Sequence, residues 1–166
     1  MRWQVIDSQG YRANIGIILA NAQHQLFWAR RINEQAWQFP QGGLQTNESY
    51  EQGMFRELHE ETGLLPEHVS ILGQTKDWLH YKLPESLIRR QRQPVCIGQK
   101  QIWFALRLQV DESHICLNVT DRPEFDAWQW VDYWQPVNDV IAFKQSVYHA
   151  ALTELAEVIM TQAQQA

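Results

Sequence analysis

The sequence predicts one α+β domain over residues 1–166, with a mixed β-sheet between helices. Three observations lead to this fold class: an apolar run near the start, a polar helical pattern before the middle, and an amphipathic pattern near the end. A chain of this length can bury one sizeable core and leaves no room for a second domain. We therefore expect strands that bracket one helix and are closed by another.

The first strands are predicted by apolar runs that turn residues interrupt. Residues 13–20 form a continuous apolar run rich in isoleucine, which is typical of a strand buried on both faces. Residues 25–29 are expected to return beside it. Residues 37–39 predict a short strand that ends at Pro40, because proline has no N–H to donate to a sheet.

A helix is expected from about Glu48 to Thr62. The side chain of Thr46 or Asn47 can cap its first turn, because short polar side chains accept hydrogen bonds from the free N–H groups there. Gly63 supplies a left-handed stop. The acidic residues near the end of this helix lie beside the negative end of its dipole, where a bound cation would relieve their repulsion.

The second half of the chain predicts further strands and a long helix. Extended segments are expected over residues 69–81, 101–110 and 125–132. A loop that contains Pro84 and Pro94 joins the first two of them. Apolar residues at helical spacing predict an amphipathic helix from Val137 to about Met160. The Gln- and Ala-rich residues that follow are expected to fray.

Lys144 interrupts the apolar stripe of this terminal helix. At about 100° per residue it falls near the middle of the apolar face, where leucine would be expected. One explanation is a long side chain that reaches past the apolar surface to water. The other is an ammonium group that points into a cleft and meets phosphate, with Phe143 beside it as an aromatic surface for the same ligand.

Glu57, Glu60 and Glu61 place three carboxylates on about one helical turn. Their spacing of i, i+3 and i+4 sends all three side chains to one side of a helix. Like charges there repel one another, whereas a hard divalent cation with oxygen ligands turns the repulsion into coordination. A solvated acidic face is the alternative for a lone pair of glutamates, but the longer pattern around these three favours a metal site.

The net charge of −5 argues against broad, nonspecific adhesion to a nucleic-acid backbone. Any phosphate ligand must therefore be held locally. Basic residues gather in two segments, with Arg12, Arg30 and Arg31 in the first and Lys82, Arg89, Arg90, Arg92 and Lys100 in the second. Such clusters are usually solvated faces, but beside an acidic cation site they can also bind a polyanionic substrate.

The cysteines argue against a zinc site, and the apolar segments argue against a membrane protein. Cys96 and Cys116 have no Cys or His pattern around them that suggests zinc, so we expect two small, partly buried thiols. The longest apolar stretch is too short to span a bilayer, and residues 1–4 do not begin a signal peptide. We therefore expect a cytoplasmic protein with no membrane partner.

The pattern around the three glutamates begins at Gly42 and continues after five residues with Glu48. After seven more residues it ends with residues 56–64, Arg-Glu-Leu-His-Glu-Glu-Thr-Gly-Leu. At every fixed position it is similar to the Nudix box, the signature of hydrolases that cleave nucleoside diphosphates linked to another group. The resemblance implies the Nudix fold, an α/β/α sandwich with a mixed β-sheet between helices.

Outside the box, the chain resembles one branch of this family, the bacterial RNA pyrophosphohydrolases, which are related to the dinucleoside polyphosphate hydrolases. The matching segments are residues 10–12, 37–43, 78–84, 98–101, 123–126 and 143–144. Ala13 departs from the proline that the family commonly has. Such enzymes remove pyrophosphate from triphosphorylated RNA 5′ ends, and the monophosphate that remains opens the transcript to degradation. The resemblance implies this reaction, and with it a part in mRNA decay.

The resemblance also implies roles for individual residues. The cofactor would be Mg²⁺, with Mn²⁺ or another divalent cation as a substitute, and its ligands would be Glu57, Glu60, Glu61 and Glu124. Within that set, Glu57, Glu61 and Glu124 would be catalytic, with Glu57 the favoured base. For the substrate, Arg12, Arg31 and Lys144 would reach phosphates and Phe143 would help to hold a base, while Tyr81 and Gln99 are less specific matches. From the residues alone, Glu124 is part of a polar turn, and Tyr81 is an aromatic beside a lysine that can stack a base.

Hydrolysis of a phosphoanhydride needs charge neutralisation on phosphate oxygens, a positioned water and a base that takes its proton. The helical glutamates can supply the first through Mg²⁺, which keeps several waters. Which carboxylate acts as the base stays open, because neighbouring negative charge raises its pKa and a cation lowers it.

Three functions remain to be compared. The first is hydrolysis of 5′-triphosphorylated RNA, and the second is hydrolysis of nucleoside polyphosphates such as diadenosine polyphosphates. The third belongs to another class, a non-catalytic nucleotide-sensing module, although such a sensor has no need of carboxylates that repel one another. The sequence does not reveal protein activators.

Overall fold

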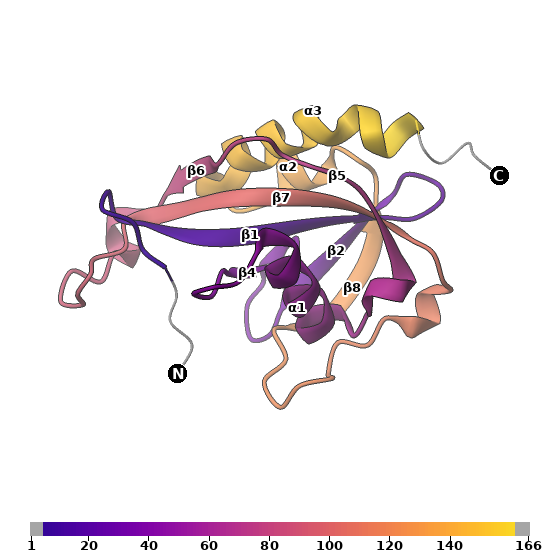
Figure 1. The fold of residues 1–166 in the computed structure, drawn as a ribbon, viewed down its shortest axis with the longest axis horizontal. Coiled ribbons are helices and arrows are strands. Elements are labelled where there is room, and N and C mark those ends of the chain that lie inside the picture. Colours follow the sequence, from indigo (N-terminus) through magenta and orange to yellow (C-terminus); the bar gives the residue numbers. More distant parts are fainter. Residues whose placement is uncertain (1–4, 162–166) are drawn as a thin grey trace.

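A computed structural model describes residues 5–161 of the chain. Within this range, eight strands form one sheet, with helix α1 (Tyr50–Thr62) on one face and helix α3 (Gln145–Thr161) on the other (Figure 1). The expected α+β class, a mixed sheet between helices, is confirmed. The Gln- and Ala-rich end that was expected to fray lies outside the described residues. In the part of the chain that the structure covers, no helix combines the length and apolar character needed to cross a membrane.

The sheet brings together strands that are far apart in the sequence, since β1 pairs directly with β7. Their bounds are Tyr11–Ala20 for β1, Leu26–Arg31 for β2, Trp37–Gln38 for β3, Gln41–Gly43 for β4, Val69–Gln74 for β5, Leu79–Lys82 for β6, Gly98–Leu108 for β7 and Phe125–Val131 for β8. The main path through the sheet runs β3-β2-β1-β7-β5. Strand β4 pairs with β1, β6 with β7, and β8 with β2.

The pairing of β1 with β7 is parallel, whereas the other strand pairs are antiparallel. It extends from Tyr11 opposite Gly98 to Ala20 opposite Arg107. Side chains of β1 alternate between two cores: Ile15 and Ile17 pack on the side of α1, and Ile18 on the side of α3. The strand is therefore buried on both faces, as its continuous apolar run predicts.

Strand β2 diverges from β1 soon after the hairpin that joins them. The two strands pair at Ala20 and Leu26, and β4 then takes the place beside β1 from Asn14 to Gly16. Strand β4 was not predicted, because its Gln-Gly-Gly sequence has no strand pattern. The divergence matters for the site, since it carries the backbone of β4 beneath α1.

Ser49 caps α1 in place of the predicted Thr46 or Asn47. Its hydroxyl accepts a hydrogen bond from the Gln52 N–H at 3.1 Å, and the Gln52 side chain accepts one from the Ser49 N–H at 2.9 Å. The prediction was wrong because Asn47 has a φ of 65°, the conformation of a tight turn, whereas an N-cap needs extended backbone. Gly63 ends the helix with a φ of 74°, as predicted.

The predicted extended segment over residues 69–81 is divided into β5 and β6. The predicted helix over residues 137–160 is divided as well, into α2 (Gln135–Asp139), a 3-10 turn (Ala142–Lys144) and α3. Val140 and Ile141 interrupt it, because neither has helical backbone: their ψ angles are 155° and 140°. Val140 and α3 nevertheless pack in the same core, so the apolar period predicted the buried face correctly and the backbone wrongly.

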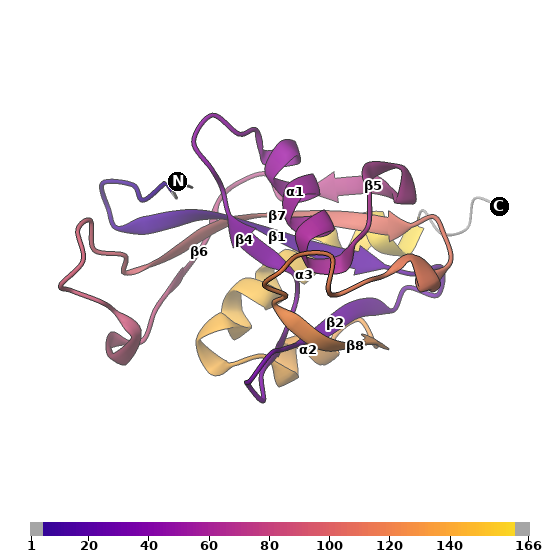
Figure 2. The same ribbon diagram turned by 90° about the horizontal axis from the view of Figure 1, so that it is seen from below.

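The connection from β7 to β8 crosses the carboxyl end of α1 (Figure 2). The Cys116 N–H in this connection donates to the Thr62 carbonyl at 2.8 Å. The contact places the residues just before β8 beside the last turns of α1, where the acidic residues lie. Both cysteines are free thiols, as expected. Cys96 is half-buried, as predicted, but the prediction of a partly buried thiol was wrong for Cys116, which is exposed in the connection between β7 and β8.

Candidate active site

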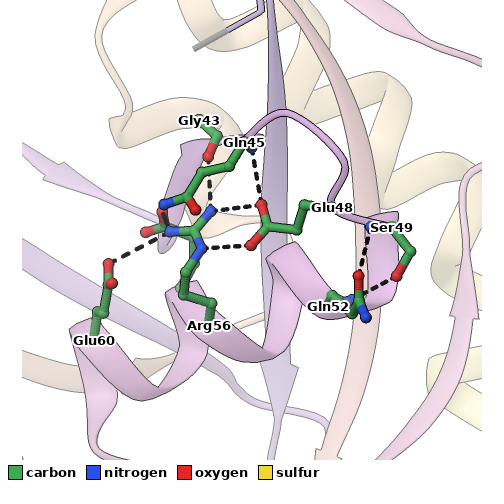
Figure 3. Close-up of polar contacts among 8 residues, drawn as sticks. Gly43, Gln45, Glu48, Ser49, Gln52, Arg56 and Glu60 are labelled. Atoms are coloured by element: carbon green, nitrogen blue, oxygen red, sulfur yellow. Dashed lines mark hydrogen bonds and ion pairs between the residues drawn. The ribbon is translucent and has the colours of Figure 1, made fainter. Parts of the chain in front are cut away.

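Arg56 organises the acidic face of α1 (Figure 3). Its Nε donates to Glu48 Oε1 at 2.6 Å, and its Nη2 donates to Glu48 Oε2 at 2.9 Å. Nη2 also donates to the carbonyl of Gly43 at 2.9 Å. Because two N–H groups meet two carboxylate oxygens side by side, the plane of the guanidinium is fixed. Glu48 precedes α1, so this pair ties the loop to the helix.

The same guanidinium holds Glu57. Arg56 Nη1 lies 2.5 Å from Glu57 Oε1 and 3.6 Å from Glu60 Oε2. The carboxylate of Glu57 also lies directly against the backbone of β4, since a β-carbon added to Gly42 would fall 1.9 Å from Glu57 Cδ. Glycine at this position therefore makes room for Glu57, which is only 8% exposed.

Glu61 begins a chain of buried polar contacts. Its Oε2 accepts a hydrogen bond from the Gln41 N–H at 3.1 Å. The Nε2 of Gln101, on β7, donates to Gln41 Oε1 at 3.2 Å and to Asn14 Oδ1, on β1, at 2.8 Å. These contacts fix Gln41 between the acidic helix and the parallel strand pair.

One cavity of about 790 Å³ collects the acidic residues. Glu57, Glu60 and Glu61 reach it from α1, and Glu124 reaches it from the segment before β8. Its wall also contains basic and amide side chains, together with a further carboxylate, a threonine and two glycines: Arg12, Arg31, Arg122, Asn14, Gln38, Gln41, Gln99, Asp121, Thr120, Gly42 and Gly43. Carboxylates and guanidinium groups on one cavity suit a ligand that brings both phosphates and a cation.

The buried carboxylates of the cavity have raised pKa values. Burial raises the pKa of Glu57 to about 7; contact with Arg56 opposes this, and the negative charges of Glu60 and Glu124 add to it. Burial likewise holds the pKa of Glu61 well above its usual range, with further increases from Glu57 and Glu124. A nearby cation would stabilise the ionised forms and lower both pKa values.

Within residues 5–161, no three carboxylate, imidazole or thiolate side chains stand close enough together to form a ready-made ion site. Arg56 gives Glu57 a competing partner. The donor set nevertheless fits a hard divalent cation, because the four carboxylates line one cavity and the two most buried of them repel each other. They are candidate ligands that would have to move closer together around an ion.

Residues 10–152 match the model of the NUDIX domain family. The chain belongs to the Nudix family. The match covers the carboxylates of α1, Glu124 and the strands that carry Arg12 and Gln99, so the resemblance seen in the sequence is confirmed at the level of the family.

Curated Nudix relatives match nearly the whole chain. It is 58% identical over 155 residues to an RNA pyrophosphohydrolase of Thioalkalivibrio sulfidiphilus, covering 93% of this chain and 90% of that protein. It is 56% identical over 155 residues to an RNA pyrophosphohydrolase of Hahella chejuensis, covering 93% of this chain and 96% of that one. An RNA pyrophosphohydrolase of Hydrogenovibrio crunogenus is 59% identical over 151 residues, or 91% of this chain and 92% of the relative.

Solved structures agree on the Nudix fold. The E. coli dihydroneopterin triphosphate pyrophosphohydrolase matches with a TM-score of 0.69 and 15% identity, over 93% of this chain and 99% of that one. A C. elegans Ap4A hydrolase matches with a TM-score of 0.61 and 16% identity, over 87% of this chain and 98% of that one. At such identities, the likeness extends to the fold alone.

The structure brings together three of the predicted substrate residues. Arg12 on β1 stands opposite Gln99 on β7 in the parallel register, and both line the cavity. Arg31, at the end of β2, lines it from the other side. Their positions facing the carboxylates of α1 follow from the pairing of distant strands, which local sequence patterns do not determine.

The other three predicted substrate residues form a group one layer behind the cavity. The Tyr81 and Phe143 rings are 5.8 Å apart, and the Nζ of Lys144 lies 5.9 Å from the centre of the Tyr81 ring. Lys144 Nζ donates to the Oε1 of Gln38, which lines the cavity, at 3.3 Å. Burial, together with the charge of Arg31, lowers the pKa of Lys144 to about 8. Lys144 is thus buried, and it does not reach past the surface to water.

Sequence reasoning missed several residues that shape this site. Arg56 and Glu48 belong to the box, but the sequence does not predict that they pair, because Glu48 precedes the helix and helical spacing does not apply to it. Asn14 did leave a signal, because it is the one amide inside the apolar run of residues 13–20, and a buried polar residue usually has a partner. Arg122, also unassigned, stands two residues before Glu124.

Proposed function

We propose that this protein removes pyrophosphate from the 5′ end of triphosphorylated RNA, leaving a monophosphate that starts the decay of the transcript. The observation that carries this proposal is the single cavity in which the carboxylates of α1 and Glu124 face Arg12 and Arg31. RNA as the substrate is supported by the relatives named RNA pyrophosphohydrolase, which are 56–59% identical. Since the resemblance is to bacterial enzymes, and bacterial transcripts are made in the cytoplasm, a cytoplasmic location is part of the proposal.

Arg12 and Arg31 bind the 5′ phosphates in this proposal. A guanidinium presents a planar fork that matches two phosphate oxygens, so it both attracts and orients the chain of phosphates. Gln99 and Gln38 add polar contacts along the wall. Lys144, held by Gln38, contributes positive charge from behind the cavity wall. Phe143, which is half-buried, offers an aromatic surface for a base, and the buried ring of Tyr81 packs beside it.

Glu57, Glu60, Glu61 and Glu124 would hold the divalent cation, which we propose is Mg²⁺, with Mn²⁺ as a substitute. When bound, it supplies neutralisation of the negative charge on the non-bridging phosphate oxygens. The oxygen donor set and the open cavity support this choice, because Mg²⁺ prefers a few carboxylates together with substrate phosphates.

Glu57 is the general base of the proposal, accepting at its carboxylate the proton of the attacking water. Two features support this assignment. Arg56 fixes the position of Glu57 Oε1 at 2.5 Å, and Gly42 removes the side chain that would otherwise fill its place. A base whose orientation is already restricted by such contacts loses less free energy to alignment when the substrate arrives.

The test is pyrophosphate release from a 5′-triphosphorylated oligoribonucleotide with Mg²⁺, with Mn²⁺ and with EDTA. Glu57→Gln should lower kcat about 10²- to 10⁴-fold, the usual contribution of a general base. Glu51→Gln changes an exposed carboxylate on the same helix and is the matched control. Release at an unchanged rate by Glu57→Gln, or in EDTA, would discard the assigned chemistry.

The same assay separates the competing functions. Diadenosine tetraphosphate is measured beside the RNA, and the ratio of the two kcat/KM values states the preference. A strong preference for the dinucleotide would make this a dinucleoside polyphosphate hydrolase. Nucleotide binding without turnover of either substrate would favour a sensing module built on the same fold.

A further inference from the structure

A second cavity, of about 290 Å³, lies beside the first. Its wall comes mainly from residues 83–97, the connection between β6 and β7, which extends past the end of the sheet where β1 begins (Figure 1). Seven residues line it: Arg12, Leu83, Leu87, Arg89, Arg92, Pro94 and Cys96. Arg12 lines both cavities, so a ligand in the first can continue into the second.

In the part of the chain that the structure describes, the guanidinium groups of this second cavity have no acidic partners. Among residues 5–161, no carboxylate forms an ion pair with Arg89, Arg92 or Arg12. Arg90, in the same loop, differs in both respects: it pairs with Glu85 at 2.7 Å and does not line the cavity. Local positive charge without an internal counter-ion attracts an anionic ligand, even in a chain of negative net charge.

Arg12 provides an independent sign of a missing ligand. Its Nε is buried and has no hydrogen-bond partner among the described residues. Buried donors are nearly always paired, so this N–H marks a place where a ligand oxygen fits. Its position on the wall shared by the two cavities places that oxygen where the 5′ phosphates would join the rest of an RNA chain.

The apolar part of the wall fits the sugars and bases of such a chain. Leu83, Leu87 and Pro94 supply it, and Leu87 keeps 51% of its surface exposed. A nucleotide offers an anionic phosphate and flat or apolar surfaces together, and this wall offers guanidinium groups and apolar side chains together. An acidic peptide would satisfy the charge, but it would not be continuous with the ligand of the first cavity.

Backbone hydrogen bonds hold the loop in this shape. The Leu83 N–H donates to the Ile97 carbonyl at 2.9 Å, and the Ile97 N–H donates to the Gly10 carbonyl at 2.8 Å. The two ends of the loop are thereby joined to each other and to the start of β1. Inside the loop, the Arg92 N–H donates to the Arg89 carbonyl at 3.1 Å, which keeps the two arginines close together.

We propose that the second cavity binds the sugar-phosphate chain of the RNA downstream of its 5′ end. Arg89 and Arg92 contact its phosphodiesters, and Arg12 contacts the junction with the 5′ phosphates. This inference rests on the proposed function, because it assigns the same substrate to an adjoining surface. It predicts that the protein distinguishes a longer RNA from a dinucleotide.

The first measurement is binding in EDTA, where turnover does not interfere. Fluorescence anisotropy gives Kd for 3′-labelled 5′-triphosphorylated RNAs of two and of eight nucleotides. Arg89→Ala combined with Arg92→Ala should raise Kd for the octamer about tenfold and leave the dimer nearly unchanged. The slope of log K against log salt should become shallower by about 0.7 for each phosphate that the variant no longer neutralises.

Arg90→Ala is the control, because it removes one positive charge from the same loop outside the cavity and can be compared with each single variant, Arg89→Ala and Arg92→Ala. All three arginines are exposed, so the variants should fold, which a melting curve verifies. Equal effects of the double variant and Arg90→Ala, or equal effects on both RNA lengths, would overturn the proposal. It would also be overturned if the double variant bound polyglutamate more weakly while its RNA affinity stayed the same.

A second probe keeps this test independent of the proposed reaction. A 5′-hydroxyl octamer lacks the phosphates of the first cavity, and the double variant should weaken its binding by a similar factor. If the unmodified protein binds this probe through the arginines but releases no pyrophosphate from any RNA, the proposed function fails and the second cavity stands. If the unmodified protein releases pyrophosphate and the double variant binds both octamers normally, the proposed function stands and the proposed role of the second cavity fails.

Discussion

Glu48 and Arg56 form a two-pronged ion pair across the start of α1, with nitrogen–oxygen distances of 2.6 and 2.9 Å. Glu48 does not line the cavity, whereas Glu57, which the same guanidinium holds at 2.5 Å, does. The pair therefore connects a residue outside the cavity to a carboxylate inside it. Both partners are mostly buried, so solvent screens the contact little.

The first prediction concerns this ion pair. Glu48→Gln should lower kcat for 5′-triphosphorylated RNA about 10- to 100-fold, in the range found when an outer partner of a ligand is removed. KM should change little, because Glu48 touches no part of the cavity. Steady-state kinetics measure both constants, with Glu51→Gln as the control. An unchanged kcat would mean that Glu57 needs no orientation by Arg56.

The second prediction concerns the space that Gly42 leaves. Gly42→Ala should displace the Glu57 carboxylate and reduce kcat at least about tenfold, because the added β-carbon would fall 1.9 Å from Glu57 Cδ. Gly73→Ala is the control, since its β-carbon would lie no closer than 3.4 Å to a side chain. Activity and a melting curve are measured for both variants. Equal activities would show that the carboxylate can lie elsewhere.

The third prediction concerns stability without metal. The pKa of Glu57 is about 7 in the folded protein and 4.5 in the unfolded chain, so the folded state binds the extra proton between these values. The free energy of unfolding in EDTA should therefore fall as pH rises from 4.5 to 7, by on the order of 3 kcal/mol from Glu57. Glu61 also has a raised pKa, so its ionisation lowers the free energy of unfolding in the same direction as pH rises.

Urea unfolding at several pH values measures this slope. Glu57→Gln should flatten it, because the amide does not titrate. Mg²⁺ should raise stability most at the upper end of the range, where the carboxylates are ionised. If the free energy of unfolding does not depend on pH between 4.5 and 7, burial does not raise the pKa of Glu57 as stated.

The fourth prediction concerns Lys144. Burial lowers its pKa to about 8, so in the free protein its ammonium loses its proton as pH rises through that value. If Lys144 supports phosphate binding, kcat/KM should fall above about pH 8, since this ratio reports groups of the free enzyme. Lys144→Arg should move this fall to higher pH, because a guanidinium stays charged. An identical pH profile in the variant would remove Lys144 from phosphate binding.

Local chemistry explains which parts of the fold were predictable. The run of residues 13–20 predicts β1 because a strand between two cores cannot carry a polar face. Gly63 predicts the end of α1 because it adopts positive φ easily. The three glutamates of α1 are predicted as a group because helical spacing alone brings them together.

The remaining features depend on tertiary contacts. Ser49 was missed as the cap because the turn at Asn47, not the local cap preference, sets where the helix begins. The break at Val140 and Ile141 was missed because α2 and α3 share one core, which preserves the apolar period. Glu124 could be tied to the other carboxylates only by resemblance, since it reaches the cavity from a connection that crosses the end of α1.

The parallel register that sets Arg12 beside Gln99 also has a consequence during synthesis. The acidic helix leaves the ribosome well before β7 does, yet the wall that faces it needs both strands. A nascent chain that ends before Gly98 thus contains the carboxylates of α1 without the β7 part of the wall. The cavity can therefore form only after most of the chain has been synthesised, because Glu124 also lines it.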